Sequence, residues 1–306
     1  MFGWTVYLLG LRIFISCIGL VGNVFLILAI IHTKFSPLKT FELFLLGLAA
    51  ANMEEIVIVN IYDIIIFQTS TTNTWLCHSL KFLTMFGKIT SIFFTVLIST
   101  FRYQKLRDVD HRVNLPVCLD SIRAALMVSG VCVMLSMLLS LPIFVISLQG
   151  PGENDTRSSG GCHPDFFVCS KYDCPVLNYF YKYLFILVCN LLPLLIVTVT
   201  SCHIIIVLLT QRKTVTPEVG MSGPSQFGRK SKGLWLQRSM ISVLAALALF
   251  QADLTPYLIF QLTFRPTDSP VWAEIEFFIA TTYTSISPYV YGIGDNLFSL
   301  KNFLKK

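Results

Sequence analysis

The chain has 306 residues, of which 54% are hydrophobic and only 13% are charged, and its mean hydropathy is +0.70. Soluble domains carry about 25% charged residues, so a soluble fold of this composition would expose large apolar patches. This argues against a secreted disulfide scaffold, a disordered chain and a cytosolic enzyme, and it places the chain in a bilayer. The net charge of +6 would indicate a nucleic-acid partner only if the basic residues gathered on a soluble face.

Seven apolar stretches are long enough to cross a membrane as helices, which takes about 20 residues each. They cover residues 7–31, 41–67, 77–103, 124–147, 176–209, 239–262 and 271–293. Barrel strands are shorter and alternate in polarity over about ten residues. No cleavable leader precedes the first stretch, so we expect it to be retained as a span. The sequence therefore predicts an all-α membrane protein with a single seven-helix domain.

The distribution of Lys and Arg predicts that the amino terminus lies outside. Sixteen basic residues then fall on the inner side: Lys34, Lys39, Arg102, Lys105, Arg107, Arg112, Arg123, Arg212, Lys213, Arg229, Lys230, Lys232, Arg238, Lys301, Lys305 and Lys306. Only five fall on the outer side: Arg12, Arg157, Lys171, Lys182 and Arg265. The basic excess is therefore a membrane-topology signal, and we expect contact with membrane lipid and no nucleic-acid partner.

This topology assigns the long connections to the two sides of the membrane. Residues 148–175 become an extracellular loop and residues 210–238 a cytoplasmic loop. The tail, residues 294–306, places Phe298, Phe303 and Leu304 among lysines, which predicts a short amphipathic helix along the inner membrane face.

The predicted extracellular side carries two possible modifications. Asn154-Asp155-Thr156 is an acceptor sequence for N-glycosylation. Four of the nine cysteines lie at this side, where disulfides persist: Cys77, Cys162, Cys169 and Cys174. Four cysteines allow three pairings. We favour Cys77–Cys169, because Cys169 lies near the middle of the second half of the loop, and the other pairings stay open.

Several short motifs lie at matching places in the spans. They are Gly22-Asn23, Leu48-Ala49-Ala50-Ala51-Asn52, Phe101-Arg102-Tyr103 (Arg102 lying 25 residues after Cys77), Pro193, Pro256 and Ser287-Pro288-Tyr289-Val290-Tyr291. Together they resemble the motifs of rhodopsin-like G-protein-coupled receptors. The resemblance implies that five residues take part in activation and G-protein coupling: Asn52, Arg102, Tyr103, Pro288 and Tyr291.

Three departures from the common pattern point to a subfamily. Asn52 and Phe101 stand where aspartates are usual, and Ser287 stands where asparagine is usual. With the short amino-terminal segment, they resemble vomeronasal type-1 receptors and the class A related olfactory receptors of fish. This resemblance implies a plasma-membrane receptor of chemosensory neurons that binds an odorant or pheromone and activates a G protein of the inhibitory or Go type. Bitter taste receptors are the alternative, but they usually carry Arg near the place of Asn52.

Charged side chains at membrane depth cost about 2.5–3.5 kcal/mol on insertion scales, so they indicate function or internal pairing. Lys88 either contacts an anionic ligand or pairs with a carboxylate, and Glu55 is the expected partner in the empty receptor. For Lys81, near the outer end, we expect the ammonium to reach the interface. Asp253 either faces the pocket or satisfies the backbone that Pro256 frees. With aromatic residues added, the candidate ligand site comprises Glu55, Asp63, Lys88, Tyr257, Phe260, Glu276 and Tyr283.

The sequence lacks the usual catalytic motifs, including a phosphate-binding loop, His-Glu-x-x-His and Gly-x-Ser-x-Gly. We therefore expect no enzymatic activity, no cofactor and no metal site. A small-solute transporter is an alternative from another class, because intramembrane carboxylates can relay ions. Such a fold predicts internal repeats, and the two halves of this chain show none.

Overall fold

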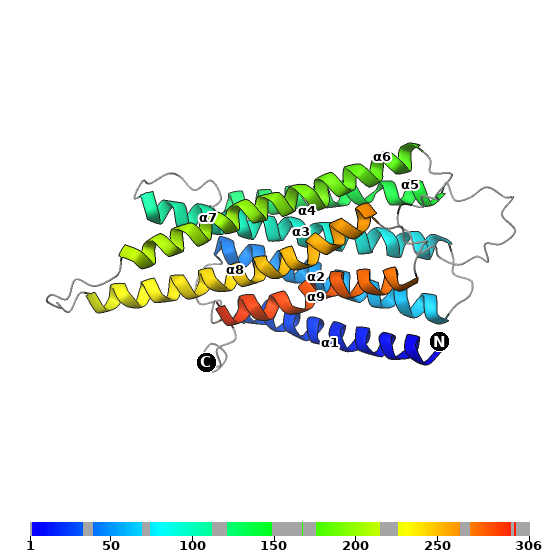
Figure 1. The fold of residues 1–306 in the computed structure, drawn as a ribbon, viewed down its shortest axis with the longest axis horizontal. Helices are drawn as coiled ribbons and strands as arrows, with labels where there is room; N and C mark the ends of the chain where they lie inside the picture. The colour runs from blue at the N-terminus through cyan, green and yellow to red at the C-terminus, as the bar shows by residue number, and fades with distance from the viewer. Residues whose placement is uncertain are drawn as a thin grey trace, which may run out of the picture.

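A computed structural model describes residues 2–32, 39–68, 74–111, 121–148, 167, 176–214, 226–263, 270–294 and 297. Helices occupy all seven predicted positions, and no strand occurs within these ranges (Figure 1). They are α1 (Phe2–His32), α2 (Thr40–Gln68), α3 (Thr74–His111), α4 (Ile122–Ser140), α5 (Pro142–Leu148), α6 (Val176–Phe185), the π-helical segment η1 (Ile186–Leu191), α7 (Leu192–Thr214), α8 (Gln226–Thr263) and α9 (Pro270–Gly294).

The helices lie side by side in an elongated bundle, with the start of α1 and the end of α9 at opposite ends (Figure 1). Helix α3 is the most central, because it packs against α2, α4, α5, α7 and α8. Helix α1 packs against α2 and α9, and α8 packs against α7 and α9. The largest cluster of buried apolar side chains draws on most of these helices, so the core runs through the whole bundle.

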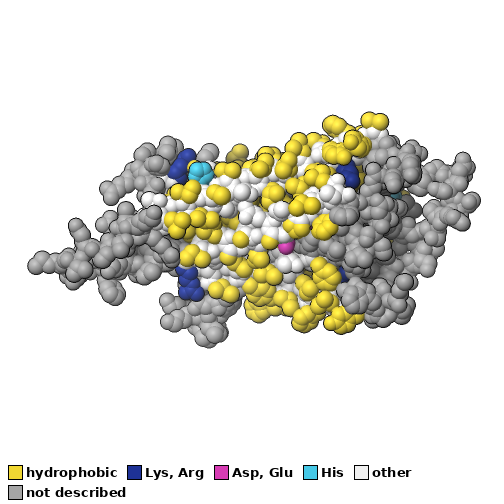
Figure 2. Space-filling view, viewed as in Figure 1, with side chains coloured by type: hydrophobic (Ala, Val, Ile, Leu, Met, Phe, Trp, Pro, Cys, Tyr) yellow, Lys and Arg dark blue, Asp and Glu magenta, His cyan; other side chains and the backbone are white. Residues whose placement is uncertain are grey.

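The outside of the bundle is apolar, as a lipid-facing surface requires. Figure 2 shows hydrophobic side chains over the middle of one face and Lys or Arg side chains near its ends. In α4, Met127 is 73% exposed and Val131 is 65% exposed. Six described stretches are long and apolar enough to span a membrane: Gly10–His32, Thr40–Tyr62, Trp75–Arg107, Ile122–Phe144, Val176–Thr210 and Arg238–Thr263.

Three helices extend further at the inner end than the apolar runs that predict them. Helix α3 continues to His111, α7 continues to Thr214, and α8 begins at Gln226 instead of near residue 239. The predicted cytoplasmic loop at 210–238 therefore contains the ends of α7 and α8. Hydropathy detects only the part of a helix that lies in lipid, whereas Lys, Arg and Gln allow the backbone pattern to continue into water.

Prolines interrupt the fourth and fifth predicted spans. The fourth divides at Leu141, and Pro142 begins α5, a position where a missing N–H costs little. In the fifth, the Leu192 N–H donates to the Leu187 carbonyl five residues earlier, which is π-helical pairing. Pro193 comes directly after Leu192 and has no N–H. The regular α-helical hydrogen bond at position 193 is therefore missing, and this gap lies at the end of the π-helical segment.

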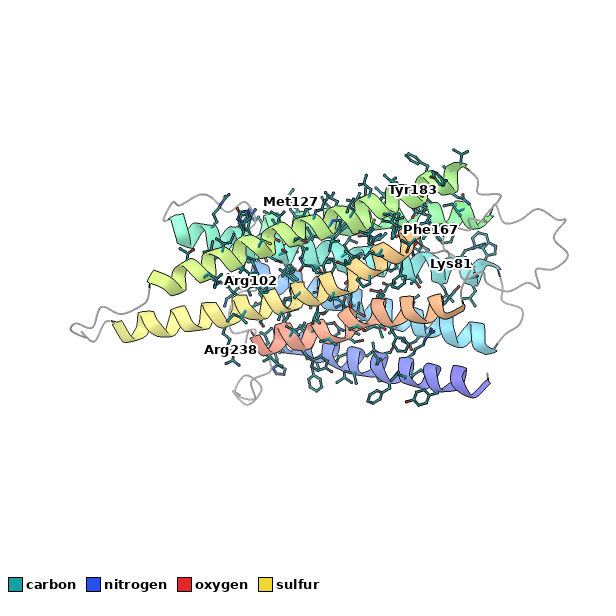
Figure 3. All side chains as sticks on the ribbon, viewed as in Figure 1. Lys81, Arg102, Met127, Phe167, Tyr183 and Arg238 are labelled. Carbon is teal, nitrogen blue, oxygen red and sulfur yellow. The ribbon has the colours of Figure 1, made fainter. Side chains whose placement is uncertain are left out.

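At the outer end, one residue of the predicted extracellular loop is part of the core. Phe167 is 3% exposed, and its ring centroid lies 5.8 Å from that of Tyr181 and 5.5 Å from that of Phe185. Figure 3 shows Phe167 at the same end of the bundle as Lys81. Cys77 at this end is disulfide-bonded. Its predicted partner Cys169, the glycosylation site Asn154 and most of the predicted amphipathic tail lie outside the described residues.

Candidate functional site

A cavity lies inside the bundle between α2, α3, α8 and α9. Its volume is about 40 Å³, well below the roughly 300–1,000 Å³ of typical small-molecule sites, so a ligand larger than a few water molecules needs the helices to move apart. Its wall combines charged, aromatic and hydroxyl side chains. The lining residues are Glu55, Lys88, Ser91, Ile92, Phe250, Asp253, Leu254, Tyr257, Tyr283 and Thr284.

Four predicted ligand-site residues line this cavity: Lys88, Glu55, Tyr257 and Tyr283. Phe260 is half-buried and is not part of the lining. The side chains of Asp63 and Glu276 lie outside the described part of the structure. The structure thus brings together residues from four separate predicted spans.

The Lys88 ammonium is held by more than a carboxylate. Its Nζ lies 3.5 Å from the centroid of the Tyr257 ring, in cation–π geometry. Lys88 also interacts electrostatically with Glu55 and with Asp253. Glu55 itself is only 4% exposed. The cavity therefore places one ammonium beside two carboxyl groups and an aromatic face, and the contact with Tyr257 was missed at the sequence level.

Asp253 joins α8 to α9. Its Oδ2 accepts a hydrogen bond from the Tyr283 backbone N–H at 2.5 Å. Asp253 therefore lines the cavity and bonds to the backbone of α9, which agrees with the expectation that it faces the pocket. Tyr283 makes two further contacts: its hydroxyl lies 2.8 Å from Thr95 Oγ1, and its ring meets the Phe250 ring edge-on. Tyr283 thus connects α9 to both α3 and α8.

A buried polar cluster, which we call the amide network, adjoins the cavity and comprises Asn23, Asn52, Ser91 and Ser287. Ser91 lines the cavity, and its Oγ donates to Asn52 Oδ1 at 2.7 Å. The Asn52 amide donates to Ser287 Oγ at 3.3 Å and to Asn23 Oδ1 at 3.4 Å. Each of the four residues is at most 3% exposed. The network therefore links the cavity wall to α1, α2 and α9.

Asn23 also supplies a hydrogen-bond donor that the backbone of α9 lacks. Pro288 lies inside this helix and has no N–H, so the Thr284 carbonyl four residues earlier has no helical donor. Asn23 Nδ2 donates to this carbonyl at 3.0 Å, and it also donates to the Gly19 carbonyl at 2.8 Å. The proline of α9 and the asparagine of α1 thus form one structural unit.

The predicted coupling residues other than Asn52 lie toward the inner end. Arg102 is 7% exposed, and Tyr291 is fully buried. The Tyr103 ring packs against the His203 ring with centroids 5.4 Å apart. Figure 3 shows Arg102 and Arg238 at the end opposite Lys81 and Phe167. The arrangement separates an outer region around the cavity from a cationic inner end.

Lys81 corrects one expectation. It is 2% exposed, so the prediction that its ammonium reaches the outer interface is wrong. The reason is packing, because the outer part of α3 lies against α2 and α5. Within the described ranges, no three His, Cys, Asp or Glu side chains gather closely enough to hold a metal ion.

Comparison with known families identifies a match over most of the chain. A family model described as "7 transmembrane receptor (rhodopsin family)" covers residues 22–291. This range begins in α1 and ends in α9, so it includes every residue that lines the cavity. A comparison with curated proteins gives no match.

Proposed function

Because the chain belongs to the rhodopsin family of seven-transmembrane receptors, we propose that it is a chemosensory receptor of the vomeronasal type-1 and fish class A related olfactory kind. It binds a small odorant or pheromone from outside and promotes nucleotide exchange on a G protein of the inhibitory or Go type. It acts at the plasma membrane of chemosensory neurons. The replacements at Asn52, Phe101 and Ser287 support this subfamily over the rest of the family.

The observation that carries the proposal is the composition of the cavity wall. Lys88 and two carboxyl groups supply charge, while Phe250, Tyr257 and Tyr283 supply aromatic surface. A wall of this composition suits a small molecule with an apolar body and one polar group, which enters as the helices move apart. Ser91 belongs both to the wall and to the amide network, so a ligand contact there can favour one helix arrangement over another.

Lys88 is the contact that we expect an acidic or hydrogen-bonding ligand to use. In the empty receptor its ammonium faces the Tyr257 ring and the carboxyl group of Glu55. A ligand group that accepts a charge-assisted hydrogen bond from Lys88 gains about 1.5–3 kcal/mol. The Lys88→Met variant should therefore shift the midpoint of the dose–response curve to ligand concentrations about ten- to a hundredfold higher.

The measurement is a dose–response curve at matched surface expression. Lys81→Met is the matched control, because Lys81 lies on the same helix and does not line the cavity. Its midpoint should stay within about threefold of the wild-type value. An unchanged midpoint for Lys88→Met with every active ligand would leave Lys88 as one member of a structural cluster.

Receptor activity itself is tested in vesicles that contain the purified chain and a heterotrimeric G protein. Ligand-dependent nucleotide exchange supports the receptor. Solute uptake without exchange would instead support the transporter, and responses limited to bitter compounds would support the taste-receptor alternative.

A further inference from the structure

The surroundings of Arg102 at the inner end of α3 are aromatic. The central guanidinium carbon lies 3.5 Å from the centroid of the Phe41 ring, which belongs to the first turn of α2. Arg102 is only 7% exposed, so this contact is largely shielded from water. The residue just before Arg102 is Phe101, whose phenyl ring cannot form an ion pair with a cation.

The Phe41 ring is held in place by two further rings. It stacks on Phe101 with centroids 6.4 Å apart and an interplanar angle of 18°. Phe44 meets Phe101 edge-on, with centroids 5.8 Å apart. We call Phe41, Phe44 and Phe101 the phenyl stack. Phe44 and Phe101 are buried, so the stack presents the face of Phe41 to Arg102 as a fixed surface.

The other cations of this region make longer contacts with aromatic rings. Lys105 Nζ lies 5.8 Å from the Phe101 centroid, and the Arg107 guanidinium carbon lies 5.9 Å from the Tyr103 centroid. Both distances are near the outer limit of about 6 Å for a cation–π interaction. Arg102 is therefore the cation whose position depends most on an aromatic face.

We propose that Phe41 is a positioning residue that holds Arg102 in the resting receptor, so that the contact between the Phe41 ring and Arg102 sets the level of ligand-independent G-protein coupling. A G protein can engage Arg102 only after the guanidinium leaves the Phe41 ring. Weakening the contact then raises basal nucleotide exchange. The inference rests on the G-protein coupling proposed above and on none of its statements about the ligand.

The test weakens the contact without changing its shape. Phe41 is replaced in the full-length receptor by 4-fluoro-, 3,5-difluoro- and 3,4,5-trifluorophenylalanine, which remove electron density from the ring face stepwise. Basal exchange should rise stepwise, by about two- to thirtyfold in total, because cation–π contacts are of that strength. Phe41→Trp should keep basal exchange at or below the wild-type level, since tryptophan binds cations best.

The same fluorinated series at Phe44 is the matched control, because the Phe44 ring packs against Phe101 in a T-shaped contact, whereas Arg102 lies over the Phe41 ring. Basal exchange should stay constant there. Unchanged basal exchange across the Phe41 series, or an equal rise across the Phe44 series, would overturn the proposal. If the role of Phe41 were purely structural, basal exchange would depend on the volume of the ring and not on the electron density of its face.

A second measurement does not need a G protein. The ¹⁹F resonance of 4-fluorophenylalanine at position 41 should shift when Arg102→Gln removes the cation, and it should stay in place for Arg107→Gln. If no shift occurs with Arg102→Gln, the contact is absent and the inference fails. If the shift occurs but the receptor produces no exchange with any ligand or variant, the proposed function fails instead.

Discussion

Asn23 takes the place of a backbone donor that α9 lacks. Its amide reaches the Thr284 carbonyl because Pro288 offers no N–H to that group. The side chain is completely buried, so water cannot replace it. An unsatisfied buried carbonyl costs about 1–3 kcal/mol.

Asn23→Ala should therefore lower the free energy of unfolding by about 1–3 kcal/mol. In a Pro288→Ala background the cost should be smaller, because alanine supplies the missing N–H to Thr284. Thermal unfolding of the purified receptor in detergent, followed for both single variants and the double variant, measures the difference. Strictly additive effects would show that Asn23 stabilises α9 by another route.

The charged residues of the cavity wall could be predicted from the sequence, whereas its serine and threonine residues could not. Lys88 and Glu55 were predicted as site residues because a charged side chain is costly to place at membrane depth and therefore indicates a functional or paired group. Ser91 and Thr284 were missed, since hydroxyl groups in helices commonly bond to their own backbone. Thr84 and Thr90 do so here, each to the carbonyl four residues earlier. Asp253 was noticed, but its partner Tyr283 is far away in sequence and could not be inferred.

The contact between α2 and α3 depends on a glycine. A Cβ atom at Gly87 would collide with Oε2 of Glu54 and would lie 3.2 Å from the Glu55 Cα. Glu54 and Glu55 belong to the part of α2 that faces α3 beside the cavity. The two helices therefore approach closely where the charged residues meet.

Gly87→Ala should destabilise the receptor by about 1 kcal/mol, because the buried Glu54 carboxyl group must move aside and the α2 backbone must shift by a few tenths of an ångström at Glu55. Gly130 in α4 is the matched control, since no atom lies within 4 Å of the place where its Cβ would be. Gly130→Ala should be neutral or stabilise the helix by up to about 1 kcal/mol. Equal unfolding temperatures for the two variants would contradict the close approach.

Helix positions were predictable in this chain, whereas helix ends and breaks were not. Long apolar runs locate all seven spans, because a helix that crosses the hydrocarbon core of the membrane must be apolar over about 20 residues. The start of α8 at Gln226 lies among basic residues, which hydropathy does not count as membrane. The π-helical segment Ile186–Leu191 lies in an unbroken apolar run, so only its neighbour Pro193 hints at irregular pairing.

The orientation of the whole molecule follows from its charge distribution and can be tested with one glycan. Asn154 lies in the loop that the Lys and Arg count places outside. Asn154→Gln should abolish a mobility shift that a glycosidase removes from the wild-type receptor. An acceptor sequence introduced within residues 215–225 should stay unmodified. Modification there, together with an unmodified Asn154, would reverse the predicted topology.

The phenyl stack has a consequence for the cell that carries the receptor. A carboxylate that restrains an arginine can be neutralised by a proton, and its attraction weakens as salt accumulates. A phenyl ring has no proton to gain and no charge of its own to screen. With Arg102 held by Phe41, the background signal of a resting cell depends on how many receptors it displays, and we expect the part of it that this contact sets to be insensitive to acidification of the cytoplasm.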